Sequence, residues 1–407
     1  MGVAAAKALE KAAEIKALQG RGRRGQVEKN SKIFISGAGV AGLTAALWLA
    51  KAGFRPTVVE RAPSVRADGF LISLSHDAYR SAEALGLMPA LQERRIGITR
   101  SSYHDPSGRC LLALDYEDLF RGLDILQLTR DDLEAVLFEA ARDVADIRCG
   151  LRAVEMAQRS DGVDVTFSDG RSEAFDAVIG ADGLHSGVRE LSFPPEKIRR
   201  HRLGLCVAAA RLPNFIGLAQ KFETHMETNR YLALFTTREG GLGGVFVWAS
   251  EEETVPPPES RAAKLQEAFR GTSDFVKSIV DHCPKNGGIY MDSLSQIEMP
   301  SWHEGRVAVV GDAAHCLTLF SGRGAAAAFN GATQLAKALI DLPPEAAFQR
   351  YEAAIRPVIS KIQPATRSAA RWYVPRSRHR ECLRNNAMRF LPNAVFQAYF
   401  RGKYSKA

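Results

Sequence analysis

The residues with the clearest chemical potential lie between Arg306 and Gly324, a stretch that reads RVAVVGDAAHCLTLFSGRG. A short apolar run ends at Gly311 and Asp312, a loop follows, and an alanine-rich segment of helical composition begins at Gly324. A carboxylate at the carboxyl end of a strand can accept hydrogen bonds from the hydroxyl groups of a cofactor chain. A helix N-terminus beside it offers free N–H groups to an anionic edge. The stretch therefore predicts a binding site for a polar cofactor.

The start of the folded region carries a second element of this kind. An apolar run leads into GAGVAG, a stretch of helical composition follows, and a second apolar run ends on Glu60. In this G-x-G-x-x-G pattern Gly37 forms the tight turn, Gly39 admits a pyrophosphate close to the backbone, and Gly42 lets helix and strand pack closely. Glu60 lies 18 residues after Gly42, where an acid can accept hydrogen bonds from a ribose. The unit predicts a dinucleotide that carries no 2′-phosphate.

Length and composition restrict the class of protein. With 407 residues, 46% hydrophobic and 25% charged, the chain is typical of a globular protein with room for two domains. No apolar run reaches the roughly 18 residues of a membrane span, and the first 30 residues lack a secretory signal. The six cysteines form no C-x-x-C motif, so we expect reduced thiols, no metal site and a cytoplasmic protein.

The net charge of +8 is concentrated at the two ends of the chain, in residues 1–30 and 371–407. Basic ends can attract nucleic acid, an anionic membrane or an acidic carrier protein. Solvated termini are the preferred interpretation, with no nucleic-acid partner. The segment MRFLPNAVFQAYFRGKYSK mixes apolar and basic residues, so peripheral membrane contact remains an alternative to a helix packed on the body or on a second subunit. We expect a monomer or a homodimer.

The composition and the pattern of strand-like and helix-like segments change along the chain and predict four parts. Residues 1–30 form a basic N-terminal extension, and residues 31–200 with 296–370 form a discontinuous cofactor domain built of alternating strands and helices. Residues 201–295 read as an inserted, mainly β domain. Residues 371–407 form a basic helical segment. The expected class is therefore α/β, a Rossmann-like domain with an inserted β-rich substrate domain and C-terminal helices.

Three motifs taken together resemble the signatures of single-component flavin monooxygenases, the aromatic hydroxylases with the para-hydroxybenzoate hydroxylase fold. They are GAGVAG, then GADG with Ser186, Val188 and Arg189 behind it, then GDAAH. YEAAIRP and WYVPRSR are similar to the subgroup that tailors natural products. The resemblance covers about residues 31–370 and implies an FAD-binding domain of the para-hydroxybenzoate hydroxylase type.

The resemblance implies a role for individual residues. Glu60 would bind the adenosine ribose, and Arg130 would contact FAD. Asp182 would lie beside the pyrophosphate and take part in NAD(P)H binding. Asp312 would hydrogen-bond the ribityl chain, and the helix from Gly324 would point at the flavin N1–C2=O edge. The full set of expected FAD residues is Gly37, Gly39, Ala41, Gly42, Glu60, Arg61, Arg130, Asp182, Gly311, Asp312, Gly322, Gly324 and Ala325.

The reaction implied by the resemblance uses NADPH or NADH to reduce FAD, and O2 to form a flavin C4a-hydroperoxide that hydroxylates an aromatic or polyketide-type small molecule. The β-rich domain would cover this substrate. Alternation along its strands decides which side chains face inward. The expected substrate-lining residues are Tyr231, Phe235, Phe246, Trp248 and Leu319, with Cys206 and the crossover residues Arg100, Tyr103 and His104 as further candidates.

Two positions depart from the family pattern. Leu319 stands where the family has a proline, and Ala326 stands where it has an asparagine. We interpret both as tuning of the loop that faces the oxygen site. No side chain is assigned as a catalytic acid or base: His315 is expected to be a loop or core residue, and Cys316 to line the flavin site without chemistry.

Other functions on this scaffold remain open from the sequence. An FAD-dependent reductase or dehydrogenase of an isoprenoid or other apolar substrate would use the same cofactor site without O2. An epoxidase or a flavin-bound scaffold protein would also fit. A halogenase does not, because its W-x-W-x-I-P motif is missing.

Overall fold

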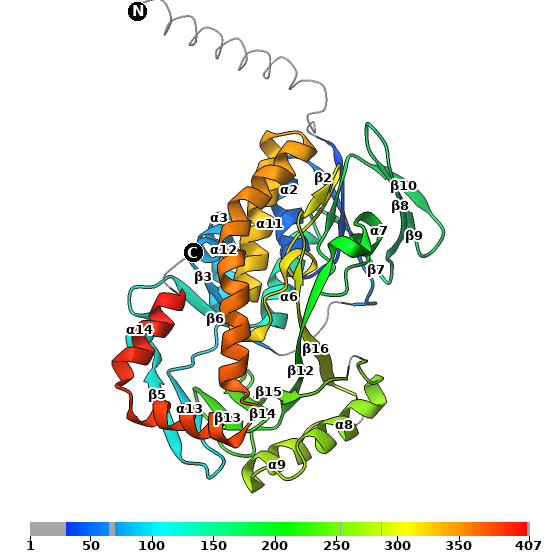
Figure 1. The fold of residues 1–407 in the computed structure, drawn as a ribbon. Helices are drawn as coiled ribbons and strands as arrows, with labels where there is room; N and C mark the ends of the chain where they lie inside the picture. The colour runs from blue at the N-terminus through cyan, green and yellow to red at the C-terminus, as the bar shows by residue number, and fades with distance from the viewer. Residues whose placement is uncertain (1–29, 65–69, 253, 286, 405–407) are drawn as a thin grey trace, which may run out of the picture.

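The computed structural model describes residues 30–64, 70–252, 254–285 and 287–404 (Figure 1). The expected N-terminal extension lies almost entirely outside the described residues, as do residues 405–407. Within them, no helix combines the length and the apolar character needed to cross a membrane.

A six-stranded sheet forms the centre of the cofactor domain. Its strands, in sheet order, are β17 (His303–Glu304), β18 (Val307–Val309), β11 (Ala177–Gly180), β1 (Lys32–Ser36), β2 (Arg55–Glu60) and β7 (Asp146–Cys149). Neighbouring strands are parallel apart from β17 with β18. The carboxyl ends of β1, β11 and β18 therefore lie side by side, and each leads into one of the three sequence motifs.

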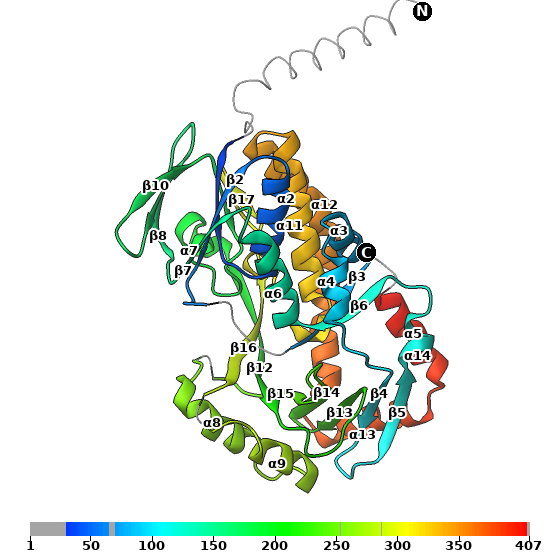
Figure 2. The same ribbon diagram turned by 180° about the vertical axis from the view of Figure 1, so that it is seen from behind.

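Helices bury the apolar strands of this sheet. The helices α2 (Val40–Lys51), α6 (Arg130–Ala141) and α11 (Gly324–Asp341) pack side by side over it (Figure 2). Ile33, Phe34 and Ile35 of β1 are completely buried, so both faces of the strand are covered. Such a continuous apolar run is typical of a parallel strand with helices or other layers on both sides.

A seven-stranded sheet forms the second half of the molecule. Its order is β16 (Ile289–Glu298), β12 (Arg199–Leu212), β15 (Leu242–Ala249), β14 (Arg230–Thr236), β13 (Lys221–Glu227), β4 (Arg100–His104) and β5 (Cys110–Asp115). The long strands β12 and β16 connect the sheet to the cofactor domain (Figure 1). The two strands β4 and β5 correct the expected boundaries, because residues 100–115 belong to this sheet and not to a segment 31–200 devoted to the cofactor.

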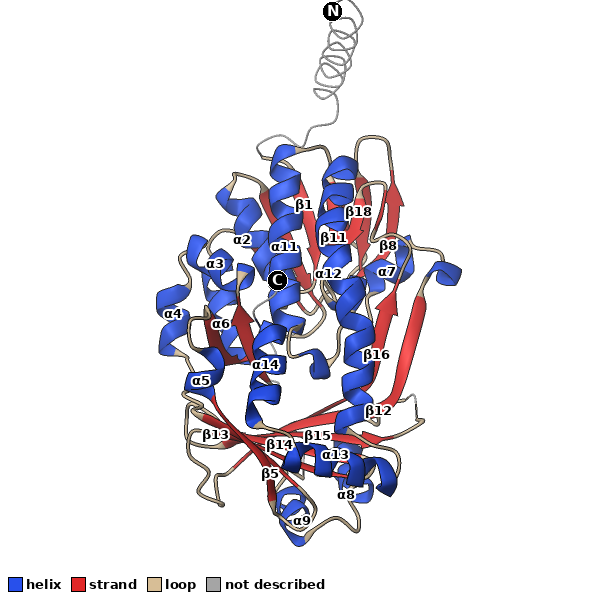
Figure 3. Cartoon of the chain, turned by 60° about the vertical axis from the view of Figure 1, so that its left-hand side comes forward, coloured by secondary structure: helices blue, strands red, loops and turns tan. Residues whose placement is uncertain are grey.

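The two faces of the seven-stranded sheet have different covers. Helices α8 (Arg261–Ala268) and α9 (Asp274–Asp281) pack on one face. The other face is covered by the end of α12 (Pro344–Tyr373), by α13 (Arg378–Phe390) and by α14 (Asn393–Tyr404) (Figure 3). Helix α12 spans 30 residues and reaches from one sheet to the other, so the expected boundary at residue 370 falls inside a helix.

The remaining elements are short and connect these layers. They are β3 (Leu71–Ser75) paired with β6 (Ile125–Thr129), the three-stranded sheet of β8 (Ala153–Gln158), β9 (Val163–Phe167) and β10 (Ser172–Phe175), the helices α3 (Asp77–Ala84), α4 (Met88–Glu93), α5 (Tyr116–Phe120), α7 (Gly187–Ser192) and α10 (Asp312–His315), and three 3-10 turns, η1 (Pro195–Lys197), η2 (Pro258–Ser260) and η3 (Leu319–Ser321).

Candidate functional site

One elongated cavity of about 640 Å³ runs between the two sheets. Its first end lies at the loop Gly37–Ala41 and at Glu60, and its second end lies among aromatic side chains of the seven-stranded sheet and the C-terminal helices. The motif residues after β1, β11 and β18 all line it. A long site with a polar half and an apolar half has room for a dinucleotide and a second molecule.

The glycines of the first motif are required by close backbone contacts. Gly37 has a φ of +104°, and a Cβ on it would lie 2.5 Å from the carbonyl oxygen of Ala181. A Cβ on Gly42 would lie 1.9 Å from the carbonyl oxygen of Gly37. The turn, strand β11 and helix α2 can therefore meet only without these side chains. Helix α2 then presents its N-terminus to the cavity with no side-chain cap, which leaves its first N–H groups free for a phosphate.

Glu60 ends β2 at the edge of the cavity, beside Arg61. Its carboxylate accepts hydrogen bonds from the backbone N–H of Ala38 (3.0 Å) and of Ala62 (2.8 Å). These bonds fix the glycine turn relative to β2. An ionised carboxylate has about four acceptor positions, so Glu60 keeps acceptors for a ligand hydroxyl.

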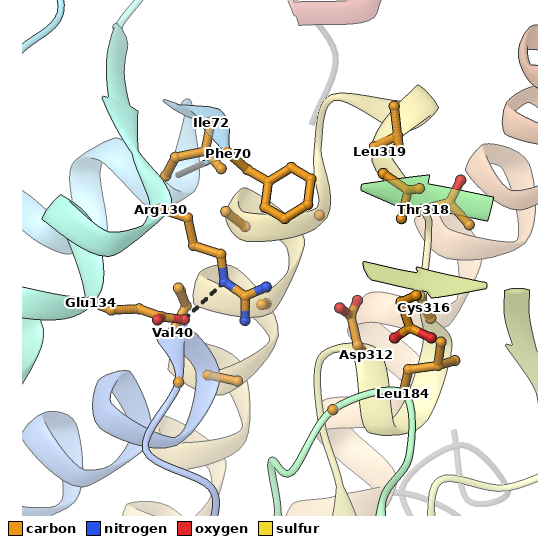
Figure 4. Close-up of a pocket in the computed structure, with 18 of the residues that line it drawn as sticks. Val40, Phe70, Ile72, Arg130, Glu134, Leu184, Asp312, Cys316, Thr318 and Leu319 are labelled. Atoms are coloured by element: carbon orange, nitrogen blue, oxygen red, sulfur yellow. Dashed lines mark hydrogen bonds and ion pairs between the residues drawn. The ribbon is translucent and has the colours of Figure 1, made fainter. Parts of the chain in front are cut away.

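Arg130 and Asp312 enter the cavity from opposite walls (Figure 4). The hydroxyl of Thr129 caps helix α6 and places Arg130 in its first turn. Arg130 Nε donates to Glu134 Oε1 at 2.9 Å, and Glu134 followed by Asp312 raises the pKa of the guanidinium above its ordinary value. Burial raises the pKa of Asp312, whereas Arg130 and the Cys316 thiol act to lower it. Both residues thus present polar groups to a ligand in the cavity.

Asp182 lines the cavity but is already bound by its own motif. Its carboxylate accepts hydrogen bonds from the hydroxyls of Ser186 and Ser36 and from the backbone N–H of Val188. Burial raises its pKa, and the bonds from Ser186 and Val188 oppose that shift. Asp182 therefore holds the start of α7 against β1 and forms the cavity wall there.

The second and third motifs are joined directly. Arg189 donates from Nη1 to the carbonyl oxygen of Ala313 (2.9 Å) and from Nη2 to that of Leu184 (2.7 Å). The guanidinium is buried, so its bonds hold the GADG loop on α10. The sequence placed Arg189 within the motif, and the structure supplies this bridging contact.

The third motif supplies a second open helix end. Gly311 and Gly322 adopt φ values of +65° and +61°, which turn the chain into and out of the loop. Helix α11 begins at Gly324 without a side-chain cap or an acid in its first turn, and Gly324, Ala325 and Ala328 line the cavity. A Cβ on Gly324 would meet no protein atom within 4 Å, so this helix end faces open space. Free N–H groups of this kind suit the electron-rich edge of a flavin.

Thr318 gives the loop of the third motif a strained point. It has a φ of +60°, and its hydroxyl is buried without a hydrogen-bond partner among the described residues. Leu319 follows it and lines the cavity as expected, while Ala326 packs among core residues and does not line the cavity. The departure at residue 319 therefore faces the cavity, and the one at residue 326 does not.

The second end of the cavity is aromatic. Tyr231 contacts Phe320 and Tyr373 edge to face, with ring centroids 5.9 Å apart in both pairs, and Tyr103 stacks on Tyr373. Burial raises the pKa of Tyr231 to about 12 and raises that of Tyr373 and Tyr103 further. These phenols remain protonated and neutral at physiological pH. The lining of this end comprises Ser101, Tyr103, Leu114, Tyr116, Leu119, Phe120, Val207, Phe222, Tyr231, Ala233, Val245, Leu294, Leu319, Phe320, Tyr373, Phe400 and Tyr404.

Three of the expected substrate residues lie elsewhere, which corrects the sequence interpretation. Phe246 and Trp248 point to the other face of the sheet, where both contact Phe269 beside α8. Tyr231 pairs with Val247 across the ladder, so the residues that flank Val247 must face away from the cavity. Phe235 lies on the correct face but is fully buried over Gly243, behind the wall formed by Phe222.

The further candidates for substrate contact also divide into residues that line the cavity and residues that lie elsewhere. Tyr103 lines the cavity, whereas Arg100 is exposed at the start of β4 and His104 stacks on His225 outside the cavity. Cys206 packs beside the cluster under α8. His315 is buried against Trp302, with ring centroids 4.8 Å apart, and Cys316 lines the cavity next to Asp312.

Sequence reasoning missed several cavity residues. Phe222 could have been found from the sequence, because side chains alternate between the two faces of β13 and Phe222 lies opposite Phe235. Tyr373, Phe400 and Tyr404 carry no local signal, because they reach the cavity only after α12 and α14 fold over the sheet. Asp292 on β16 was also missed; it accepts from Tyr290 (3.3 Å) and pairs with His185 (3.2 Å) across the junction of the two sheets.

The polar half of the cavity fits FAD. It offers two uncapped helix ends, a glycine turn that excludes a Cβ, and the charged pair Arg130 and Asp312. Among the described residues no three His, Cys, Asp or Glu side chains gather as metal ligands, and the six cysteines are free.

Comparisons with known proteins point the same way. The model of the FAD binding domain family matches residues 30–364. A flavin-dependent monooxygenase of an unknown prokaryotic organism is 32% identical over 345 residues, covering 82% of this chain and 88% of that protein. A flavin-dependent monooxygenase from Legionella longbeachae serogroup 1 (strain NSW150) is 31% identical over 347 residues, covering 83% and 88%.

Solved structures share the fold over nearly the whole chain. Tetracycline destructase Tet(51) superposes with a TM-score of 0.77 at 26% identity, covering 91% of this chain and 98% of that one. HpxO of Klebsiella pneumoniae, complexed with FAD and uric acid, superposes with a TM-score of 0.81 at 21% identity, covering 93% and 98%. This agreement confirms the expected α/β architecture. The chain therefore belongs to the FAD binding domain family and is an FAD-dependent monooxygenase of the single-component, para-hydroxybenzoate hydroxylase-like class.

Proposed function

We propose that this monooxygenase hydroxylates a neutral, apolar aromatic molecule of polyketide type, with NADPH or NADH as the reductant and O2 as the oxygen source. Bound FAD supplies hydride acceptance and oxygen activation. The chain itself supplies the binding, the orientation and the exclusion of water that such chemistry requires.

The observation that carries this proposal is the lining of the aromatic end of the cavity. Among its described lining residues there is no Lys or Arg, and the one acid at its border is Asp292, which pairs with Val207 across the ladder of β12 and β16. The charged lining residues, such as Arg61, Arg130 and Asp312, belong to the polar half. A carboxylate or phosphate substrate would lose its water there without gaining a counter-charge. A neutral ring system loses little on transfer and gains contacts with Phe320, Tyr373 and Tyr231.

Hydroxyl groups at this end support a substrate that bears oxygens. The phenol of Tyr103 hydrogen-bonds that of Tyr373, and Tyr116 hydrogen-bonds Gln127 and Ser101. Because burial keeps these phenols protonated, each can donate a hydrogen bond to a substrate carbonyl or hydroxyl as well as accept one. The arrangement favours a phenol or quinone-like ring over a pure hydrocarbon.

The polar half would hold FAD along the path of the three motifs. The N-terminus of α2 would receive the pyrophosphate, Glu60 the adenosine ribose, and Asp312 the ribityl hydroxyls. The N-terminus of α11 would face the flavin edge and stabilise negative charge on it by about 0.3–2 kcal/mol. Leu319, which lines the cavity beside Phe320, would contact both flavin and substrate.

Oxygen-dependent turnover tests the proposal. The purified FAD-loaded protein should consume NADPH or NADH and O2 faster in the presence of a neutral polycyclic phenol than in its absence, and mass spectrometry should find a product 16 Da heavier. Stimulation by a benzoate and not by neutral phenols would contradict the substrate class. Anaerobic reduction of an apolar substrate without O2 uptake would instead support the reductase alternative.

A further inference from the structure

The C-terminal helices carry an exposed surface that is both apolar and basic. Leu383 and Phe390 of α13 are 63% and 70% exposed, although leucine and phenylalanine side chains are usually buried. We call this surface the α13–α14 patch. It consists of Leu383, Phe390, Leu391, Val395 and Tyr399 with Arg378, Arg380 and Arg389.

The charge of residues 371–407 is one-sided, although α5, which packs on α14, carries the exposed acids Glu117 and Asp118. Arg378, Arg380 and Arg389 are exposed, and Arg389 lies over the ring of Phe390 at 5.1 Å. The only acid between residues 371 and 407 is Glu381, and its carboxylate accepts a hydrogen bond from Thr228 at the body of the protein. The arginines of the patch therefore have a local field that favours an anionic partner.

Helix α14 separates this patch from the substrate end of the cavity. Val395 and Tyr399, four residues apart, form its exposed face. Phe400 and Tyr404, also four residues apart, line the cavity from its inner face. Arg401 anchors the helix through hydrogen bonds to the carbonyl oxygens of Asp118 (2.9 Å) and Arg121 (3.1 Å). One helix thus has an apolar surface outside and a substrate wall inside.

We propose that the α13–α14 patch docks on the surface of an anionic lipid bilayer. Apolar side chains that project between arginines can insert among headgroups while the guanidinium groups bind lipid phosphates, and a tyrosine suits the interface between the two. An acidic protein would use the arginines but would leave these exposed apolar side chains unexplained. The docked helix would also place the cavity next to a reservoir of apolar molecules; this consequence rests on the proposed function, whereas the docking does not.

Co-sedimentation of the full-length, FAD-loaded protein with vesicles tests the docking. We expect binding to vesicles of phosphatidylcholine with 30% phosphatidylglycerol, weak binding to pure phosphatidylcholine, and a loss of binding in high salt. The variant R378E/R380E/R389E should bind more than 100-fold more weakly, since each basic residue near an anionic surface contributes about fivefold. The variant F390S/V395S/Y399S should lose at least about tenfold in affinity while the flavin content stays unchanged.

Matched variants elsewhere on the surface keep the test specific. V144S/V154S/F215S replaces exposed apolar residues, and R55E/R95E/R100E replaces exposed arginines, all outside the patch. Docking through the patch predicts vesicle binding close to that of the parent for the apolar control, and a smaller loss for the charge control than for the patch variant. Failure of the parent to bind anionic vesicles would overturn the proposal, as would equal losses in patch and control variants. A dimer that dissociates in F390S/V395S/Y399S would assign the patch to a second copy of the chain and also overturn it.

Discussion

Phe320 and Tyr373 stack with their ring centroids 5.9 Å apart and their planes 12° from parallel. Phe320 belongs to the loop that follows the GDAAH motif, and Tyr373 ends α12 more than fifty positions later in the chain. The pair joins the loop of the third motif to the C-terminal wall of the cavity. In the proposed function, this contact holds the substrate next to the flavin.

Removing this contact should impair substrate binding and spare the cofactor. We expect Tyr373→Leu to raise the KM for a hydroxylated substrate about tenfold, because stacking contributes about 0.5–1.5 kcal/mol and one phenol hydrogen bond is lost with it. FAD content should match the parent. Steady-state kinetics with O2 and peroxide detection would measure the change, including any NADPH oxidised without product.

A buried aromatic on the other face of the same sheet provides the control for Tyr373→Leu. Trp248→Leu removes a buried aromatic of larger size under α8. It should lower thermal stability without raising the KM. An equal rise in KM for both variants would show that the effect comes from the sheet as a whole and not from the cavity wall.

The glycine turn after β1 leads to a prediction about the retention of FAD. Gly42→Ala should prevent retention of FAD, because the new Cβ would lie 1.9 Å from the carbonyl oxygen of Gly37 and must displace the turn. The flavin absorbance that remains after gel filtration measures this directly.

Gly97→Ala serves as its comparison, since a Cβ there meets only the amide of Gln220 at 3.8 Å. This variant should keep parent levels of flavin. A yellow Gly42→Ala protein with the same flavin content would refute the role of the turn.

The carboxylate of Asp312 should act on FAD affinity through its charge and its acceptor oxygens. Asp312→Asn keeps the size of the side chain but removes the negative charge that faces Arg130. A hydrogen bond to a charged group contributes about 1.5–3 kcal/mol, so the Kd for FAD should rise about 10- to 100-fold. Fluorescence titration of the apoprotein with FAD provides the value.

An exposed acid is the appropriate comparison for Asp312. Asp341 pairs with Arg350 on the surface, and each side chain is 58% exposed. Asp341→Asn should leave the Kd within about twofold, because surface pairs contribute about 0–1 kcal/mol and lie far from the ligand. Equal affinities for Asp312→Asn and the parent would remove Asp312 from the cofactor site.

Buried His315 should make the stability of the protein depend on pH. Burial lowers its pKa to about 4, below the 6.5 expected when the chain is unfolded. The unfolded chain therefore takes up the proton first, so the contribution of His315 to stability is complete above about pH 6.5 and is lost as the pH falls toward 4. The free energy of unfolding of the parent should decrease between pH 7 and 4 by about 3 kcal/mol more than that of His315→Gln.

Urea denaturation at several pH values would measure this difference. The variant will be less stable than the parent at pH 7, since its side chain lacks the ring that contacts Trp302. Only the change of the free energy of unfolding with pH reports on the titration of His315. Parallel curves for parent and variant between pH 7 and 4 would mean that His315 is not the buried titrating group.

The strands, turns and helix starts of the three motifs could be predicted from the sequence because their determinants are local. A strand, a glycine turn and a helix N-terminus are built from consecutive residues, and the requirement at Gly42 comes from the carbonyl oxygen of Gly37 within the same unit. The acid at residue 60 ends β2, the acid at residue 312 begins α10 just after β18, and parallel strands place both at the same edge of the sheet. The motifs therefore also predict how their residues are arranged relative to one another.

The substrate half was decided by tertiary structure. Phe246 and Trp248 were expected in the cavity but face α8. Side chains alternate between the two faces of a strand, and the elements that pack on each face decide which set of side chains lines the cavity. Tyr373 and Tyr404 became cavity residues only because α12 crosses between the sheets and α14 folds back over them. Local sequence determines which side chains share a face. The packing of distant elements determines whether that face meets solvent, core or substrate.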